Sequence, residues 1–278
     1  MMLCADTPDF APFYVSRAEI LSGKNDPQCE SDLKKALSID NGWRYQLRLA
    51  NFYINHQQYD KSLAIAEPFY KKHPDNFVIG SLYAKTLLLN KRYNEADVLL
   101  TKINIIPTEA ATEGHELYRE AKLMQAVQMI HKKNYKASLK FITEARQWPE
   151  NLGVGKPYDE DIDYRLEDWM TYLCYQKLKK NSEADAVLKN IVKFEPKVEN
   201  TVRNFLPANA LVTAWSYDAL NRKDEALRFL DRQIKYFPDY KLILWSKSVY
   251  MKDNSVTLAA GDKDANARII EELVQTGK

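Results

Sequence analysis

The sequence predicts an all-α protein, a right-handed α-α superhelix of about six stacked helix pairs followed by C-terminal capping helices. The first observation is a recurring amphipathic segment that begins near a small residue and ends about a dozen residues later, usually at a proline. The small residues are Cys29, Ser62, Ala96, Ser138, Ala184 and Ala226, and the closing residues are Asn41, Pro74, Pro107, Pro149, Pro196 and Pro238. Recurrence at a fixed period is the mark of a repeat architecture.

Two further observations support this fold class. The closing residues lie roughly 33 residues apart at first and roughly 42 to 47 residues apart later, within the range of helical repeats. The 278 residues include only 8 glycines and 11 prolines, too few turn residues for many short strands. Stacked repeats bury their apolar faces on one another, so a long chain needs no division into separate cores. We therefore expect a single solenoid domain over residues 1–278.

The regular repeats are expected at about residues 8–107. The first pair, about residues 8–41, has the weakest pattern, whereas the second pair is the clearest. Its apolar and aromatic positions follow helical spacing: Leu47, Ala50, Tyr53, then Leu63, Ala66, Phe69 and Tyr70. The third pair repeats this pattern position by position, with a turn at residues 90–93 and an end at Pro107. These residues predict three similar helix pairs.

The repeats lengthen at about residues 108–197. Residues 108–133 form one long helical pattern, and its partner helix ends at Trp148-Pro149. The segment "WPENLGVGKPYDEDIDYR" follows, with two glycines, two prolines and several acids, and predicts a loop at one edge of the array. A second long helix is expected at about 162–179. The last repeat and a helical cap are expected at about 198–278, because a terminal repeat must shield its apolar face from water.

Three segments resemble the tetratricopeptide repeat, in which small residues, aromatics and a closing proline recur. They are "LANFYINHQQYDKSLAIAEPFYKKHP", "YAKTLLLNKRYNEADVLLTKINIIP" and "AWSYDALNRKDEALRFLDRQIKYFP". The resemblance covers most of residues 10–240 and implies the fold. It implies protein binding as the general activity of the family, while the residues that select a partner vary.

A narrower resemblance rests on "PENLGVGKP" between two such helices and on "DFAPFYVSRAEIL" near the start. Both are similar to the C-terminal tetratricopeptide region of large bacterial proteins with β-rich N-terminal domains of unknown function. The N-terminal domains are absent from this sequence, so no activity of theirs carries over. The resemblance implies a role as a partner protein or a detached tail in a carbohydrate-related system.

Composition excludes some function classes. Lys and Arg total 40 against 38 Asp and Glu, and a net charge of +2 gives no strong field for nucleic acid or anionic lipid. Three widely spaced cysteines imply no disulfide framework. No segment is long and apolar enough for a signal peptide or a membrane span. We expect a cytoplasmic protein, or a periplasmic one if the chain is a processed form.

No motif favours catalysis, a metal or a cofactor, so we expect none of the three. The run Gly153 to Pro157 lacks the first glycine and the Ser or Thr of a phosphate-binding loop. Asp159, Asp161 and Asp163 alternate as in a calcium loop, but the sharp-turn glycine and the bidentate glutamate are missing. Helix capping explains these acids better, with calcium as a minor alternative. The sequence leaves open whether the loop at residues 150–163 binds a ligand.

The resemblance to the tetratricopeptide repeat implies one remaining candidate site, a concave groove lined by the first helix of each pair. Its predicted partner-binding residues are Arg44, Asn51, Asn55, Lys85, Trp169, Trp215 and Asp218. Tryptophan is a favoured anchor at interfaces, although most aromatics in such a chain pack between helices. We predict a non-catalytic scaffold that binds a peptide segment or a neighbouring domain, as a monomer or weak homodimer. The alternative is a glycan-binding accessory component that uses Trp169 and Trp215.

Overall fold

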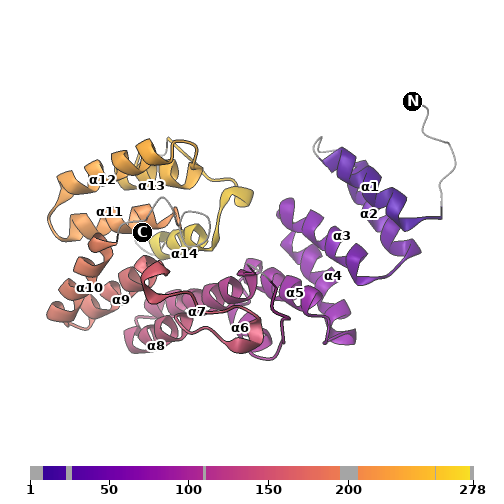
Figure 1. Cartoon of the computed structure of the whole chain (residues 1–278), viewed down its shortest axis with the longest axis horizontal. Helices are drawn as coiled ribbons and strands as arrows, with labels where there is room; N and C mark the ends of the chain where they lie inside the picture. Colours follow the sequence, from indigo (N-terminus) through magenta and orange to yellow (C-terminus); the bar gives the residue numbers. More distant parts are fainter. Residues whose placement is uncertain (1–8, 23–26, 109–110, 195–205, 254, 276–278) are drawn as a thin grey trace. The chain divides into compact units, whose positions relative to one another are not determined.

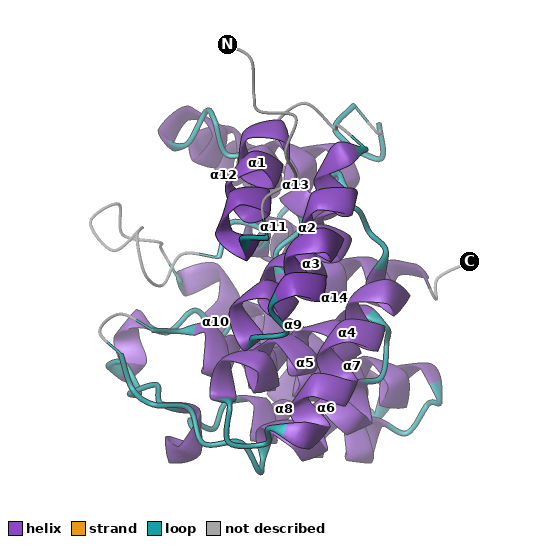
Figure 2. Ribbon diagram, turned by 90° about the vertical axis from the view of Figure 1, so that its right-hand side faces the viewer, coloured by secondary structure: helices purple, strands orange, loops and turns teal. Residues whose placement is uncertain are grey.

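The computed structural model describes residues 9–22, 27–108, 111–194, 206–253 and 255–275. Within these ranges the regular structure is helical, and loops connect the helices (Figure 2). The chain divides into two compact units, residues 1–107 and 108–278. This boundary coincides with the predicted end of the regular repeats. The expectation of one domain over the whole chain stays a prediction.

The first unit consists of three antiparallel helix pairs (Figure 1). Its helices are α1 (Ala11–Ser22), α2 (Gln28–Ile39), α3 (Trp43–Asn55), α4 (Tyr59–Lys72), α5 (Phe77–Leu89) and α6 (Tyr93–Leu100). Each helix packs on its neighbours in sequence, and α3 also contacts α5. Small residues sit where helices approach closely, since Ala50, Ala66 and Ala96 have no exposed surface. The helix pairs predicted for this part of the chain are therefore confirmed.

The second unit contains three more pairs and two further helices. Its helices are α7 (Glu113–His131), α8 (Tyr135–Ala145), α9 (Arg165–Lys177), α10 (Asn181–Lys193), α11 (Asn209–Ala219), α12 (Lys223–Tyr236), α13 (Lys241–Met251) and α14 (Ala265–Val274). The all-α architecture of six helix pairs plus C-terminal helices is thus confirmed. The second long helix is not: α9 has 13 residues, as α3 and α5 do. The additional length of this repeat lies in the loop before α9 rather than in the helix.

The turns inside the five helix pairs from α3–α4 to α11–α12 have the same backbone conformation. Five non-glycine residues adopt a left-handed φ of 58° to 60°, two positions before the second helix of a pair begins: Gln57, Lys91, Lys133, Lys179 and Asn221. Glycine is the residue that adopts this conformation without strain. The amide two or three residues after each first helix donates back to its last turn, as Arg92 N does to the Leu87 oxygen at 2.8 Å. The described turns therefore recur with the same backbone geometry in both units, as the helices do.

The long loop between α8 and α9 is held at both of its ends. Trp148 stacks on His115 of α7, with ring centroids 3.4 Å apart and an angle of 5° between the planes. Leu152 is fully buried, and Gly153 turns the chain with a φ of 66°. Tyr158 at the middle of the loop is 78 % exposed. The loop is therefore anchored to the unit while its centre faces solvent.

Helix α14 packs on α7, the first helix of the same unit. Ile269 and Ile270 on α14 are fully buried. On the same helix Arg268 forms two hydrogen bonds, both 2.7 Å, with Glu120 of α7. The expected cap thus closes the second unit on itself: the last helix returns to the first.

Candidate functional site

A cavity of about 420 Å³ opens in the second unit between α9, α11 and α14. Its lining residues are Trp169, Leu173, Trp215, Asp218, Ala219, Leu273 and Val274. Ligand sites are usually concave, mostly apolar and equipped with a few polar groups. This cavity fits that description, because Asp218 is the one charged residue among those seven.

The two tryptophans form one aromatic wall. Their ring centroids lie 5.6 Å apart at an angle of 31°, and Tyr172 lies 5.0 Å from Trp169. Trp169 and Leu173 are one helical turn apart on α9, so both face the same direction. Both tryptophans are half-buried, whereas a packed core residue would be covered. The wall therefore combines a fixed geometry with accessible ring surface.

The last turns of two helices form part of the rim. Asp218 and Ala219 end α11, and Leu273 and Val274 end α14. A helix C-terminus carries a partial negative charge, and neither of these helices has a basic residue in its last turn. Val274 is 48 % exposed, and Asp218 is exposed as well. The rim is therefore negative and the walls are apolar.

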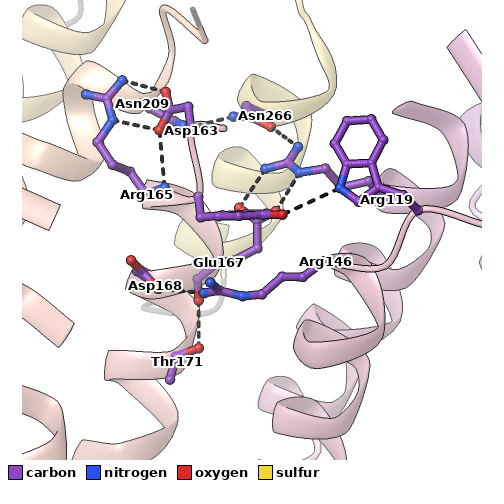
Figure 3. Close-up of polar contacts among 11 residues, drawn as sticks. Arg119, Arg146, Asp163, Arg165, Glu167, Asp168, Thr171, Asn209 and Asn266 are labelled. Atoms are coloured by element: carbon purple, nitrogen blue, oxygen red, sulfur yellow. Dashed lines mark hydrogen bonds and ion pairs between the residues drawn. The ribbon is translucent and has the colours of Figure 1, made fainter. Parts of the chain in front are cut away.

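A buried polar network fixes the three helices that line the cavity (Figure 3). Arg119 of α7 donates to both carboxylate oxygens of Glu167 on α9, at 2.6 and 2.8 Å. It also donates to Asn266 of α14 at 2.6 Å, and Asn266 donates to Asn209 of α11 at 2.7 Å. Each lining helix thus contributes one residue that is at least 99 % buried.

The electrostatics of this network depend on complete pairing. Burial disfavours the charged form of Arg119, but the adjacent Glu167 carboxylate outweighs it and raises the pKa of the guanidinium. A buried charge is tolerated when it is paired and hydrogen-bonded. On the same helix as Glu167, burial raises the pKa of Asp168 although Arg146 donates to it at 2.5 Å. These groups hold the helices in register, and none of them lines the cavity.

A second buried pair anchors the start of α9. Arg165 donates through Nε and Nη2 to Asp163, at 2.8 and 2.6 Å, and through Nη1 to Thr213 of α11 at 2.9 Å (Figure 3). Asp163 was the third acid of the possible calcium loop. Both of its oxygens accept hydrogen bonds from Arg165, and no cluster of potential metal ligands occurs among the described residues. Its role here is to position α9.

The predicted site residues fall into two sets. Trp169, Trp215 and Asp218 lie together at the cavity of the second unit. Arg44, Asn51 and Asn55 lie on α3 of the first unit, and Lys85 lies on α5.

On α3, Arg44 and Asn55 are exposed, and the Arg44 guanidinium lies 4.5 Å from the centroid of the Trp43 ring. Asn51 and Lys85 are half-buried. The binding role of all seven residues stays a prediction.

Sequence reasoning missed the C-terminal contribution to the cavity and the network behind it. Leu273 and Val274 read as apolar positions of a cap, yet they complete the cavity. Arg119 and Glu120 lie in a helix buried from Gly114 to Val127 with one exposed position. Charged residues on such a helix require partners, but only the fold shows that α9 and α14 supply them.

Two cysteines and one lysine of the described residues are the other candidates for reactivity. Cys29 and Cys174 are buried, and burial raises the pKa of the Cys174 thiol. Lys156, next to the run of glycines, forms an ion pair with Asp159 at 2.7 Å. In the part of the chain that the structure describes, no helix is long and apolar enough to cross a membrane.

Comparison with solved structures identifies the fold class. A tetratricopeptide-repeat protein from Parabacteroides merdae aligns over 96 % of this chain and 93 % of its own, with 11 % identity and a TM-score of 0.50. A thermophilic tetratricopeptide-repeat protein from Thermus thermophilus aligns over 75 % and 98 %, with 20 % identity and a TM-score of 0.43. PilF of Pseudomonas aeruginosa aligns over 86 % and 97 %, with 13 % identity and a TM-score of 0.43.

The chain has the fold of the tetratricopeptide-repeat proteins, as the three sequence segments predict. No family model matches the sequence, and no curated protein matches it significantly. The narrower resemblance to the C-terminal region of large bacterial proteins stays a prediction.

Proposed function

We propose that this protein is a non-catalytic scaffold that binds an extended segment of a partner protein. The observation that carries the proposal is the cavity of about 420 Å³ between α9, α11 and α14, with Trp169 and Trp215 as one wall. Tryptophan is enriched among the few residues that dominate the binding energy of protein interfaces. The three helices are fixed by buried hydrogen bonds, so the cavity is formed before a partner arrives, and little ordering cost opposes binding.

The lining favours a protein side chain over a sugar. A sugar presents several hydroxyl groups, each of which needs a hydrogen-bond partner when it is buried. The side chains that line the cavity offer aromatic and aliphatic surface, two indole N–H groups and a single carboxylate, that of Asp218. Glycan binding by Trp169 and Trp215 is therefore the weaker alternative, and the same experiment distinguishes it.

The test is selection of binders from a random peptide library displayed on phage, with the whole chain immobilised. Peptides that survive selection are synthesised, and their affinity is measured by fluorescence anisotropy. We expect micromolar binders whose affinity falls at least tenfold with Trp215→Ala, because the anchor surface is lost. Tyr158→Ala, at an exposed position of the long loop, is the matched aromatic control and leaves affinity unchanged.

Two outcomes would replace this proposal. Failure to select any peptide whose binding depends on Trp215 would remove the cavity as a protein-binding site. Binding on a glycan array that is abolished by Trp215→Ala would establish the sugar alternative.

The predicted residues of the first unit are proposed to form polar contacts with a partner on that unit. Alanine at Arg44, Asn51, Asn55 or Lys85 should weaken, by small factors, peptides selected for binding to the first unit, since exposed polar contacts contribute little each. The proposed oligomeric state, a monomer or weak homodimer, is checked by light scattering over a range of concentrations.

A further inference from the structure

The cavity joins three sources of negative potential to an apolar interior. Asp218 supplies a full charge at the rim. The C-terminal turns of α11 and α14 supply the negative ends of two helix dipoles. The faces of Trp169 and Trp215 carry the negative part of the aromatic quadrupole. All of these favour a cation, and none of the lining residues is basic.

A nearby basic residue is engaged elsewhere. Arg222, which follows α11, forms two hydrogen bonds of 2.6 Å with Glu225 and lies over the ring of Tyr217 at 5.0 Å. Among the ion pairs of the described residues, none includes Asp218. Within the described residues the Asp218 carboxylate therefore has no ion-pair partner.

The shape of the lining adds a second requirement on the ligand. Leu173, Leu273 and Val274 present aliphatic surface beside the tryptophan faces. Lys and Arg side chains combine an aliphatic stem with a cationic end, and such side chains bury the stem against apolar surface. A guanidinium or ammonium group over a tryptophan face gains cation–π attraction. One lysine or arginine side chain can thus pack its stem against the apolar walls and place its charge beside the negative rim.

We propose that the cavity lined by Trp169, Trp215 and Asp218 binds the arginine or lysine side chain of an apolar segment in a partner protein. This inference rests on the proposed function, because it specifies the partner's chemistry at the same site. The stem of the bound residue lies along Leu173 and Leu273, and its charged end lies between the tryptophan wall and Asp218. The partner is therefore a basic-apolar segment rather than an acidic or purely apolar one.

The test uses four blocked pentapeptides, acetyl-Ala-Leu-X-Leu-Ala-amide, in which X is arginine, citrulline, norleucine or glutamate. Citrulline has the shape of arginine without its charge. Titration is followed by tryptophan fluorescence and by isothermal calorimetry with the whole chain. We expect the arginine peptide to bind about tenfold more tightly than the citrulline peptide, and the glutamate peptide to bind most weakly.

Variants assign the effect to the rim. Asp218→Asn should weaken the arginine peptide about fivefold and leave the citrulline peptide unchanged. Asp239→Asn, in the exposed turn between α12 and α13, makes the same change in charge and should alter neither affinity. The circular dichroism spectrum and melting curve of each variant confirm that it folds. Higher salt should reduce the preference for arginine.

The outcomes separate this inference from the proposed function. Equal affinity for the arginine, citrulline and norleucine peptides, or no binding by any of the four, overturns the cationic site. Peptides selected from the random library without a basic residue also overturn it, yet their dependence on Trp215 would leave the scaffold proposal standing. An Asp218→Asn effect matched by Asp239→Asn would show a general charge effect and would overturn the site as well.

Discussion

The two units share one repeat but are stabilised by different kinds of contacts. In the first unit the helix pairs bury apolar and small residues, and each ion pair of the described residues keeps at least one partly exposed partner, as do Arg92 with Glu95 and Arg17 with the buried Asp32. In the second unit the pair of Arg119 and Glu167 lies in the interior, with side-chain exposures of 9 % and 0 %. Surface pairs contribute little to stability, whereas a broken buried pair is costly.

The units also differ in how far apart in sequence their contacts reach. Pairs in the first unit join neighbouring helices, as when Tyr53 donates to Glu30 at 2.9 Å. In the second unit Arg119 and Asn266 are 147 positions apart, and Glu120 and Arg268 are 148 apart. A regular repeat is thus built from local rules, whereas a repeat that must enclose a cavity needs contacts from its last helix back to its first.

The largest expected effect concerns the buried ion pair of Arg119 and Glu167 in the second unit. Arg119→Met leaves the Glu167 carboxylate buried without its partner and should lower the free energy of unfolding by about 3–5 kcal/mol. The double variant Arg119→Met, Glu167→Met removes both charges and should recover most of that loss. Urea unfolding followed by circular dichroism measures the change.

Hydrogen exchange shows whether the loss stays within one unit. We expect amides of α7, α9 and α14 to exchange faster in Arg119→Met, while amides of α3 and α4 keep their protection. Equal loss of protection in both units would mean that they unfold together. The two units would then differ in the kinds of contacts they contain but not in their stability.

The second prediction tests close packing in the first unit. A Cβ atom at Gly80 would lie 2.2 Å from Ile103 Cδ1 and 3.0 Å from Tyr70 Cε2. Gly80→Ala should therefore cost about 1–3 kcal/mol, as overpacking does. Adding Ile103→Val removes the closest atom and should restore part of the loss.

Gly155→Ala is the control, because a Cβ there would meet no atom within 4 Å. It should leave the melting temperature nearly unchanged. If Gly80→Ala were neutral too, the first unit would be more adaptable than its tight apolar interfaces indicate.

The sequence was sufficient to predict the repeat but not the closure of the second unit. Spacing of apolar positions predicts each helix pair, because each pair buries a continuous stripe on its neighbour. Trp169 and Trp215 could be assigned to the groove by counting from the small residues of each repeat. The partners of Arg119 could not be predicted, because a contact between residues 147 positions apart does not affect the local periodicity of the sequence.

The long loop between α8 and α9 was also predicted only in part from the sequence. Two glycines, two prolines and several acids predict a loop before α9, but its anchoring by Leu152 and Asp163 depends on tertiary contacts. The long-helix prediction for 162–179 was wrong because Asp163 accepts hydrogen bonds from Arg165 N and Nε and so stays outside the helix. A short polar side chain at this position competes with helical hydrogen bonding.

The third prediction concerns pH and the second unit alone. Burial, followed by the charge of Arg119, lowers the pKa of His115 from 6.5 to about 3. In the unfolded chain the imidazole takes up a proton near pH 6.5, so between pH 6.5 and 3 the unfolded state binds more protons. Stability therefore falls as the pH drops through this window, by about 1 kcal/mol for each pH unit below 6.

His115→Phe keeps an aromatic ring against Trp148 and removes the titrating group. Urea unfolding at pH 7, 6 and 5 should show a smaller loss of stability in the variant than in the original chain. An identical pH profile for both would indicate that the imidazole is accessible to protons in the native state, and that the second unit is less tightly closed than its buried network implies.

The smallest expected effect examines the feature that both units share. Lys91 and Lys179 occupy equivalent turns with φ values of 58° and 60°. Glycine relieves the strain of a left-handed conformation but also has more freedom in the unfolded chain, so Lys91→Gly and Lys179→Gly should each stabilise by about 0.5 kcal/mol. Alanine at either position keeps the strain and should give no gain. Since the two turns have the same geometry, thermal unfolding should show equal gains. A gain confined to one unit would mean that the turn is set by its surroundings and not by the repeat.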